Sequence, residues 1–478
     1  MFKHTISFIL VLLAATFSSS NAQDVQILEK QLTKNRWYGS QKDYTQKVND
    51  STFLLMQYGV GGSVIQKYND RLELIYEINL NDNGGSYVPS YEYVEKEDAI
   101  YVFHKDEQKK TFTLKAEVYS VVDGKLIFKK DLYEGKEKPE IWLDNSNMYF
   151  FLAREEEKNS LRFSMYDLQL KEINNQVIEI ESKPYELSTI TANYKGELYA
   201  IYNNNDTNNL KIEQLSQNGD RKEFSVDCDF EGLDYKNVNA FMFDSDRLLI
   251  ISHLRGKKSS FQYYLQYLNV HNGEYETVKS DYFDEDYILS LFGEVSEQDI
   301  ARGKVKPKKK LGGLMDPQVM ATDDGSIYFL IEESGITGYR RYANIHYSNI
   351  AIYEAESILL MKFDAVGNSW NRIVQRDEAL KQDRGSTDLN YKNLKARFFL
   401  ADDNIYLFTP EREGSTGRLY VRRLNAKTGK LFETFPLKEN CYITNSFYTL
   451  LLNEHNFIFM SSNRCFLVSG YILNSVTF

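Results

Sequence analysis

The chain is poor in cysteine and proline, with three cysteines and seven prolines in 478 residues. An odd and small number of cysteines excludes a disulfide-rich scaffold, and their spacing fits no zinc motif. Cys441 and Cys465 fall in the last repeat and could form one bridge. The alternative is three buried thiols, with Cys228 as the third. So few prolines also exclude long polyproline linkers.

The chain also lacks the short motifs that carry catalysis or cofactor binding. No Gly-x-Ser-x-Gly elbow, HExxH pair, phosphate-binding loop or dinucleotide-binding glycine pattern stands in a suitable context. The histidines are scattered, and paired carboxylates such as Glu332-Glu333 are common in β-turns. We therefore predict no catalytic residue, no cofactor and no metal site. An enzyme whose carboxylates meet only in space stays open.

Long apolar runs are absent beyond the first 22 residues, so no transmembrane helix is predicted. There, a basic start at Lys3 and His4 precedes the apolar run Ile6–Phe17, and small residues follow up to Ala22. The apolar run is too short to span a bilayer and has the form of a leader. We predict a signal peptide over 1–22, cleavage near Ala22 and a secreted or periplasmic protein.

Positive charge is in deficit, because 57 Lys and Arg face 68 Asp and Glu, a net charge of −11. This balance argues against nucleic acid or an anionic membrane as the main partner. We expect a monomer whose partner is a protein or a glycan.

What the chain does contain is a repeat of about 50 residues, a period typical of propeller blades or solenoid units. An aliphatic–aromatic run, bounded by Asn, Asp and Gly, marks each copy and indicates a short antiparallel strand. Few amphipathic helical stretches are present, so we predict an all-β fold, a β-propeller of seven or eight four-stranded blades. A row of β-sandwich domains is the alternative. The runs are Thr52–Met56, Ala99–Phe103, Met148–Leu152, Glu197–Ile201, Arg247–Ile251, Ser326–Leu330, Asn404–Phe408 and Asn456–Met460.

The clearest copy of the repeat spans Asp402–Leu437 and predicts three strands, at Asn404–Phe408, Arg418–Leu424 and Lys430–Phe435. The last copy is short by one strand. We expect Val25–Leu32 to supply it, because that pairing would close the ring and remove exposed sheet edges. The propeller would then form one domain over 23–478.

Two insertions, at 280–317 and 334–356, interrupt the period, and a third break lies at Asn371–Ala396. The first insertion contains an acidic stretch with four carboxylates over 281–286, a predicted helix from Ser296 and the basic run Lys304–Lys310. The basic run is interpreted either as an anion contact or as a solvated loop. The acidic residues could bind Ca²⁺, but their spacing is not that of an EF-hand loop. They are Asp281, Asp284, Glu285 and Asp286.

The second insertion replaces a short hairpin with about 25 residues rich in Tyr and Arg. Long irregular insertions in regular repeats tend to be functional. Tyr and Arg give large contact areas, and Arg also holds carboxylates with two hydrogen bonds. The alternative is a long hairpin whose aromatic residues pack on the neighbouring blade. The candidate partner-binding residues are Tyr339, Arg340, Arg341, Tyr342, His346 and Tyr347.

A further pattern lies around the second insertion. A strand ends in an Asp-x-x-Gly turn followed by Trp, at Asp364, Gly367 and Trp370, and the next unit begins with an acidic turn and a Tyr strand. With these motifs, the segment Asp323–Glu411 resembles exported repeat proteins of Bacteroidetes. The resemblance implies export and a propeller-like fold, and it adds no catalytic residue.

These observations together predict a secreted or periplasmic binding protein. It would engage a protein or glycan partner through the propeller face that carries the insertions. The alternative is a carbohydrate-active or other hydrolytic enzyme with carboxylates at the propeller channel, because the fold alone does not decide between the two.

Overall fold

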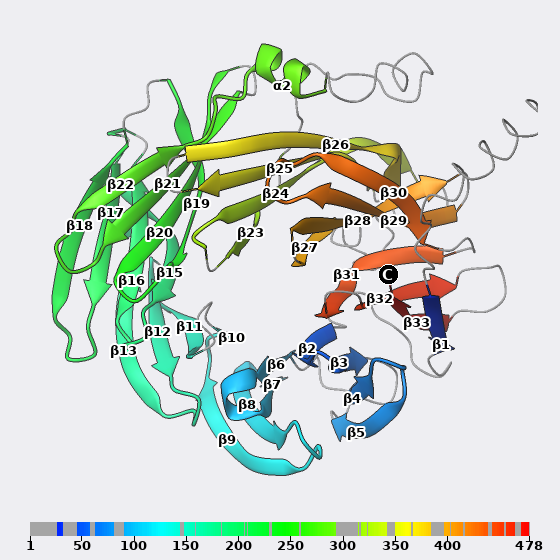
Figure 1. Cartoon of the computed structure of the whole chain (residues 1–478). Helices are drawn as coiled ribbons and strands as arrows, with labels where there is room; N and C mark the ends of the chain where they lie inside the picture. Colours follow the sequence, from blue (N-terminus) through cyan, green and yellow to red (C-terminus); the bar gives the residue numbers. More distant parts are fainter. Residues whose placement is uncertain are drawn as a thin grey trace, which may run out of the picture.

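The computed structural model forms a ring of eight antiparallel sheets (Figure 1). The structure describes residues 26–31, 45–57, 63–80, 90–143, 148–157, 159–182, 184–204, 206–207, 209–228, 232–257, 260–292, 314, 317–322, 324–341, 349–364, 367–383, 396–401, 403–413, 416–437, 442–453, 456–463 and 470–477.

Each of the eight sheets is one blade, and its strands follow one another in chain order. Blade 1 holds β2 (Thr45–Asn49), β3 (Thr52–Gln57), β4 (Ser63–Asn69) and β5 (Leu74–Leu80). Blade 2 holds β6 (Ser90–Val94), β7 (Ala99–Gln108), β8 (Thr111–Ser120) and β9 (Leu126–Gly135). Blade 3 holds β10 (Glu140–Leu143), β11 (Phe150–Glu157), β12 (Ser160–Tyr166) and β13 (Glu172–Glu179). Blade 4 holds β15 (Tyr185–Ala192), β16 (Leu198–Asn204), β17 (Asn209–Leu215) and β18 (Arg221–Asp227), with the short β14 (Glu181–Ser182) beside β15.

The second half of the ring repeats this plan. Blade 5 holds β19 (Asp234–Met242), β20 (Arg247–Arg255), β21 (Phe261–Asn269) and β22 (Tyr275–Lys279). Blade 6 holds β23 (Gln318–Ala321), β24 (Ile327–Arg341), β25 (Asn349–Asp364) and β26 (Gly367–Asp383). Blade 7 holds β27 (Arg397–Ala401), β28 (Asn404–Glu413), β29 (Thr416–Asn425) and β30 (Leu431–Leu437). Blade 8 holds β31 (Tyr442–Asn453), β32 (Asn456–Asn463) and β33 (Gly470–Thr477), completed by β1 (Gln26–Gln31).

The N-terminal strand closes the ring, as the sequence predicts. Strand β1 pairs antiparallel with β33, from Gln26 opposite Thr477 to Gln31 opposite Ile472, and forms the outermost strand of blade 8 (Figure 1). The first and last strands of the described chain therefore share one sheet, which joins the end of the ring to its beginning. The eight-blade form of the prediction is confirmed. The alternative of separate sandwich domains is wrong, because every sheet packs on two neighbouring sheets.

The core is divided into eight apolar clusters, one at each interface between neighbouring blades. The second strand of each blade supplies both of its interfaces, since alternate side chains of a strand point to opposite faces. In β20, Leu248 and Ile250 pack toward blade 4, whereas Leu249 and Ile251 pack toward blade 6. A strand buried on both faces reads as a continuous apolar run, which explains the recurring motif.

The recurring run is therefore the second strand of each blade, lying in β3, β7, β11, β16, β20, β24, β28 and β32. The first strands precede it and lie nearest the centre of the ring (Figure 1). Their composition is mixed because one side faces the channel, and β2 and β10 alternate between half-buried and exposed residues. This weaker pattern is why the repeat itself predicts three strands where four are present.

One α-helix, α2 (Glu285–Phe292), lies beside the outermost strand of blade 6. It belongs to the predicted first insertion but precedes the helix predicted from Ser296, a segment that lies outside the described residues together with Lys304–Lys310. Asp284 accepts a hydrogen bond of 2.8 Å from the amide of Tyr287 and so caps the first turn. Phe283 and Ile288 join the cluster between blades 5 and 6. A short 3₁₀ turn, η1 (Glu95–Glu97), connects β6 and β7.

Candidate functional site

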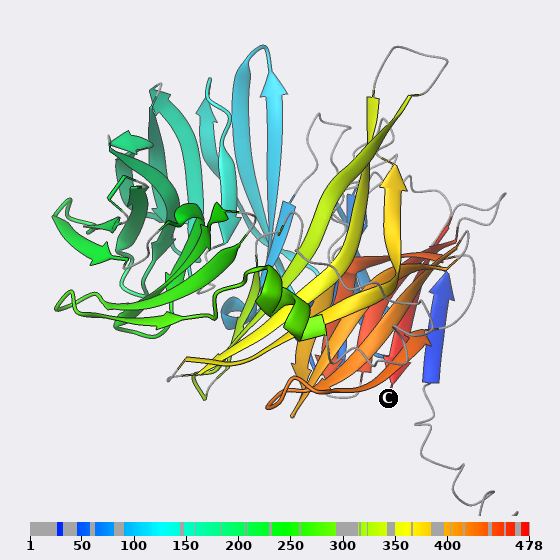
Figure 2. The same ribbon diagram turned by 90° about the horizontal axis from the view of Figure 1, so that it is seen from above.

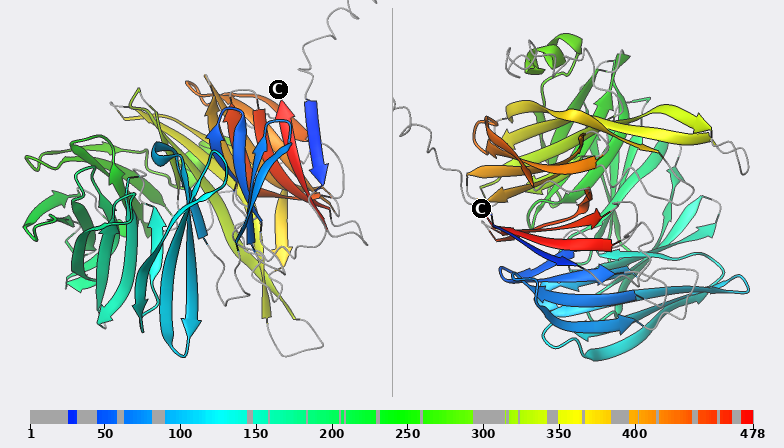
Figure 3. Two further views of the ribbon diagram at one scale, coloured as in Figure 1. Left: turned by 90° about the horizontal axis from the view of Figure 1, so that it is seen from below. Right: turned by 90° about the vertical axis from the view of Figure 1, so that its right-hand side faces the viewer.

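The antiparallel plan separates the connections of the ring into two sets. Links between first and second strands, and between third and fourth strands, lie on one side, which we call the turn face. Links between second and third strands, and links from one blade to the next, lie on the other side, which we call the hairpin face. All three breaks in the period, 280–317, 334–356 and Asn371–Ala396, reach the hairpin face. The hairpins β7–β8 and β24–β25 both extend toward that side (Figures 2 and 3).

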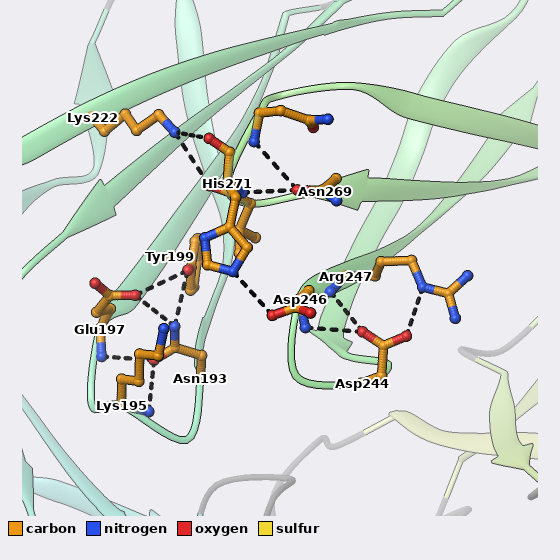
Figure 4. A network of polar contacts seen from close by, with 12 residues as sticks. Asn193, Lys195, Glu197, Tyr199, Lys222, Asp244, Asp246, Arg247, Asn269 and His271 are labelled. Carbon is orange, nitrogen blue, oxygen red and sulfur yellow. Dashed lines mark hydrogen bonds and ion pairs between the residues drawn. The ribbon is translucent and has the colours of Figure 1, made fainter.

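The turn face is occupied by contacts between blades. In the turn between β21 and β22, the Asn269 side chain accepts hydrogen bonds from two backbone amides, of His271 at 2.9 Å and of Asn272 at 3.2 Å. Lys222 of blade 4 donates to the carbonyl oxygen of His271 at 2.8 Å (Figure 4). His271 in turn contacts Asp246 at 2.9 Å. This hydrogen bond lowers the pKa of Asp246 from its ordinary value.

This kind of contact between neighbouring blades, which we call a clasp, recurs around the ring. A side chain of one blade donates to a carbonyl oxygen in a turn of the next blade at the interfaces 1–2, 2–3, 3–4, 4–5 and 6–7. The donor–acceptor pairs are Lys67 with Val121 at 2.9 Å, Tyr101 with Leu168 at 2.6 Å, Tyr149 with Tyr194 at 2.6 Å, Lys222 with His271 at 2.8 Å, and Trp370 with Ala426 at 3.2 Å. The polar side chains of this face thus serve the structure, and we place no ligand there.

The predicted site residues lie at the outer end of the blade 6 hairpin. The insertion 334–356 is mostly a regular extension of β24 and β25 rather than an irregular loop, with Tyr339 opposite Ala351 and Arg341 opposite Asn349. The backbone of Tyr339, Arg340 and Arg341 is therefore in strand β24. Their side chains, and Tyr342, His346 and Tyr347 entirely, lie outside the described residues. The prediction that these residues contact a partner stays a prediction.

The base of this hairpin is built around a buried ion pair. The register between β25 and β26 jumps there, since Ser357 faces Gln375 but Ala355 faces Leu380. Arg376, inside this bulge, pairs with Glu332 of β24, and the side chains are 0 % and 3 % exposed. The second carboxylate oxygen of Glu332 accepts a hydrogen bond of 3.0 Å from the amide of Ala396, at the start of blade 7. A bulge redirects the strand that carries it, so these contacts fix the direction in which the hairpin leaves the ring.

A groove that the sequence reasoning missed lies on the opposite blade. Blades 2 and 6 stand four positions apart in a ring of eight, so their hairpins face each other across it (Figure 1). Strands β7 and β8 have ten residues each and are paired along their whole length. A space beside this sheet has a volume of about 1170 Å³. We call it the blade 2 groove; its lining includes Asn79, His104, Asp106, Thr113, Lys115 and Glu117.

Strand periodicity explains the polar lining of this groove. Opposite pairs such as His104 and Lys115, or Asp106 and Thr113, share the groove side of the sheet. The residues between them in sequence, such as Leu114 and Ala116, face blade 3 and are fully buried. The alternation of polar and apolar residues in Thr111–Val118 is the signal that could have revealed a strand with one open face.

Glu117 is the centre of a polar cluster in the groove. Its carboxylate accepts hydrogen bonds from Tyr119, at 2.5 Å, and from Lys129, and lies 3.3 Å from Nε2 of His104. Burial alone would raise the pKa of Glu117, but the hydrogen bonds from Lys129 and Tyr119 and the charge of His104 lower it. Burial and the bond to Glu117 raise the pKa of Tyr119. Glu117 is thus held as an ionised acceptor and Tyr119 as a neutral donor, an arrangement suited to binding rather than to proton transfer.

The channel offers one carboxyl group with a raised pKa among the described residues. Glu92 lies on the inner strand β6 and accepts a hydrogen bond of 3.1 Å from Gln46 of β2. Burial raises its pKa, against the effect of that hydrogen bond. Glycoside hydrolysis would need a second carboxylate within about 5–10 Å of Glu92. If a catalytic centre were sought in the channel, Glu92 would be the first residue to test.

The remaining predicted features are explained by local structure. Asp281, one of the four acidic residues weighed as a Ca²⁺ site, accepts hydrogen bonds from Tyr287 and from Asn371, the latter at 2.8 Å, and so ties α2 to β26. Within the described ranges, no three His, Cys, Asp or Glu side chains gather closely enough to hold a metal ion. Cys228 is a free buried thiol. Cys441 and Cys465 lie outside the described residues.

No helix in the described part of the chain is long and apolar enough to cross a membrane. No protein-family model and no curated protein matches the sequence. The resemblance to exported repeat proteins of Bacteroidetes therefore stays a prediction.

Solved structures with a similar fold cover most of the chain. The WD40 domain of SCAP from fission yeast is 8 % identical, over 95 % of this chain and 98 % of that one, with a TM-score of 0.40. An ulvan-type polysaccharide lyase bound to a disaccharide of glucuronate and sulfated rhamnose is 9 % identical, over 93 % and 95 %, also with a TM-score of 0.40. A putative 6-phosphogluconolactonase from Bacteroides uniformis is 11 % identical, over 79 % and 93 %, with a TM-score of 0.35. At these scores the similarities carry no argument about function, and the fold rests on the strand pairing itself.

Proposed function

We propose that the protein is a binding protein that engages a protein or glycan partner through its hairpin face. The observation that carries this proposal is the blade 6 hairpin, whose strands β24 and β25 have 15 and 16 residues and extend beyond the body of the ring on the face where the breaks in the period collect. Extended elements on a rigid ring can hold a partner over the channel mouth without catalytic chemistry. The turn face, whose side chains connect the blades, is the less suitable surface.

The partner-binding residues of this proposal are the Tyr and Arg residues at the end of the blade 6 hairpin. Tyr339, Arg340 and Arg341 continue strand β24 beyond the body of blade 6, and Tyr342, His346 and Tyr347 follow them. Such side chains dominate binding hot spots because they give large contact areas at modest entropic cost. The buried pair at the hairpin base supports the role, because a site on a fixed element loses less entropy on binding.

The partner would be met at the cell envelope or outside the cell. A leader over 1–22 with cleavage near Ala22 supports this location. The fold is compatible with such processing, since β1 begins at Gln26 and cleavage would leave the closing strand whole. The protein would then act as a secreted or periplasmic monomer.

The test is capture of a partner by the mature chain, Gln23–Phe478, from its own cell envelope, together with a glycan array. We expect a saturable partner, and a loss of at least about tenfold in its affinity in the variant Tyr339→Ala/Arg340→Ala/Arg341→Ala, about 1.4 kcal/mol. Because these residues lie beyond the body of blade 6, we expect the melting temperature to change by less than about 2 °C.

A matched control comes from the turn face. The variant Tyr194→Ala/Lys195→Ala/Lys171→Ala removes one tyrosine and two basic residues that are exposed there, and it should bind as the unaltered chain does. Equal losses in both variants, or a hairpin variant that binds normally, would overturn the proposal for this surface. A large fall in melting temperature in the hairpin variant alone would show instead that the hairpin residues pack on the ring.

A further inference from the structure

We propose that the blade 2 groove binds acidic sugar units of a glycan. This inference rests on the binding role proposed above and names a ligand class for a second site on the same face. The groove is a concave polar surface of about 1170 Å³, a size suited to a short oligosaccharide. Its walls are the extended strands β7, β8 and β9, so the site is held by a sheet rather than by a loop.

The hairpin tip above the groove keeps an unfavourable backbone conformation. Gln108 pairs with Thr111, which leaves Lys109 and Lys110 as a two-residue turn. Both lysines have positive φ, 52° and 70°. A two-residue turn with positive φ at both positions favours Asn-Gly, because at positive φ the Cβ atom of most other residues crowds the backbone. Strain at an exposed tip points to function rather than to stability.

Lys109 lines the groove and Lys110 follows it in the same turn, so the tip carries positive charge next to the groove. Both are exposed, and neither ammonium group pairs with a carboxylate of the described chain. Deeper in the groove, two of the four lining carboxylates have a cationic neighbour, since Lys129 pairs with Glu117 and Lys115 lies 3.6 Å from Asp131. Lys130 donates to the carbonyl oxygen of Leu170 at 2.7 Å, so the exposed lysines at the tip are the cations best placed to meet a ligand. An acidic protein, with a net charge of −11, thus presents a local basic site that would attract an anion.

The rest of the lining suits a sugar. Thr111 and Thr113 offer hydroxyl groups, and Asn79 and Gln108 offer amides, each able to donate and accept hydrogen bonds. A sugar ring carries hydroxyl groups that need both kinds of partner, and a uronate or sulfate group adds the negative charge that Lys109 and Lys110 would hold.

A peptide ligand fits this surface less well. Protein interfaces depend on a few buried aromatic or Arg anchors. Among the described residues that line the groove there is no Arg or Trp, and the one Tyr, Tyr119, is 8 % exposed and bonded to Glu117. A lining of hydroxyl, amide and charged groups offers little apolar surface to such an anchor.

The test uses two acidic polymers, polygalacturonate and dextran sulfate, and their neutral counterparts, methyl-esterified polygalacturonate and dextran. In titrations with the full mature chain, we expect at least one acidic polymer to bind at least tenfold more tightly than its neutral counterpart. The binding should weaken as sodium chloride rises from about 50 to about 500 mM, because exposed charges are screened.

The variant Lys109→Asn/Lys110→Gly tests the role of the two positive charges without destabilising the turn that carries them. It removes both ammonium groups and installs the preferred residues of the turn, so it should melt at a temperature no lower than the unaltered chain and bind the acidic polymer at least tenfold more weakly. The control Lys171→Asn/Lys195→Gly removes two exposed lysines of the turn face and should keep the affinity.

Three results would overturn the inference. The first is equal binding of the acidic and neutral polymers. The second is full affinity in Lys109→Asn/Lys110→Gly. The third is equally tight binding of poly-glutamate, which would indicate an acidic peptide as the ligand. If the blade 6 hairpin still captures an envelope partner while no acidic polymer binds, the inference about the groove fails and the proposed function stands.

Discussion

The two faces of the ring show how one repeat can serve both structure and binding. On the turn face, most blades have a short turn whose polar groups are paired within it and with the preceding blade, as Asn425 and Ala426 illustrate in blade 7. On the hairpin face, connections range from the two-residue turn at Lys109 to the extended hairpin of blade 6. Length varies on this face, although some of its links also join blades, as Asp281 does through its hydrogen bond with Asn371.

The difference between the two faces indicates where binding sites are expected in a propeller of this kind. A side chain that holds two blades together cannot change without cost, so regularity marks the structural face. The departures from the repeat collect on the other face, and the strained turn at Lys109 and Lys110 lies there too. The turn face therefore joins the blades and the hairpin face carries the binding surfaces, a division that substitutions can test.

The largest loss of stability is expected from a substitution at Glu332, a structural residue on the hairpin face. Glu332→Ala leaves the guanidinium group of Arg376 buried without its carboxylate and removes the acceptor for the amide of Ala396. We expect the free energy of unfolding to fall by about 3–5 kcal/mol. Urea denaturation followed by tryptophan fluorescence would measure it.

The control for this prediction replaces both charges. In Glu332→Leu/Arg376→Met, no buried charge is left alone, so most of the lost stability should return. If the single and double variants are equally unstable, shape rather than charge governs this position. If Glu332→Ala costs less than about 1 kcal/mol, the hairpin base is not the anchor that we describe.

A smaller loss of stability is expected on the turn face, at a glycine that contacts the preceding blade. Gly429 has a φ of 66°, and a Cβ atom there would lie 2.6 Å from the ring of Trp370 in blade 6. Gly429→Ala should therefore cost about 2–4 kcal/mol, from the left-handed backbone and from the displaced ring together. The midpoint of thermal or urea unfolding would report this cost.

Gly325 provides the matched position in a neighbouring turn. Its φ is 81°, but no atom lies within 4 Å of the site of a Cβ. Gly325→Ala should cost only about 1 kcal/mol, for the backbone conformation alone. The difference between the two substitutions measures the contact between blades. Equal costs would mean that the clasp at Trp370 contributes nothing.

The sequence predicts the fold well because the strongest pattern belongs to the most buried element. Second strands such as Arg247–Ile251 face apolar clusters on both sides, so their run stands out, and its recurrence gives the number of blades. The closing strand near Val25–Leu32 follows from counting strands. The inner strands are not predicted by the same pattern, because one of their sides faces the channel. In Glu140–Leu143, for example, exposed and half-buried residues alternate.

The site is harder to predict, because it depends on how strands that are separate in the sequence lie side by side. The groove lies along β7, β8 and β9, and its lining also includes Asn79 of blade 1, a relation that no local motif records. The strained turn is hidden too, since Lys109 and Lys110 resemble a solvated loop until the pairing of Gln108 with Thr111 is known. The insertion at 334–356 is visible in the sequence, whereas its regular hairpin geometry is not.

The smallest expected effect compares two carboxyl groups, one in the groove and one at the channel, through the pH dependence of stability. The pKa of Glu117 lies below its ordinary value of 4.5 and that of Glu92 lies above it. The stabilisation by ionised Glu117 is present above pH 4.5 and is lost as the pH falls through its lowered folded-state pKa. The contribution of protonated Glu92 is present below pH 4.5 and is lost as the pH rises through its raised folded-state pKa.

Substitution by glutamine should therefore act in opposite directions at neutral pH. Glu117→Gln should lower the free energy of unfolding by about 1 kcal/mol at pH 7, because a neutral amide accepts weaker hydrogen bonds from Lys129 and Tyr119. Glu92→Gln should raise it slightly, because no charge is then buried beside Gln46. Urea unfolding between pH 3 and pH 7 would show both differences shrinking toward acid pH. A difference for Glu117→Gln that persists unchanged at pH 3 would mean that its charge is not what stabilises the groove.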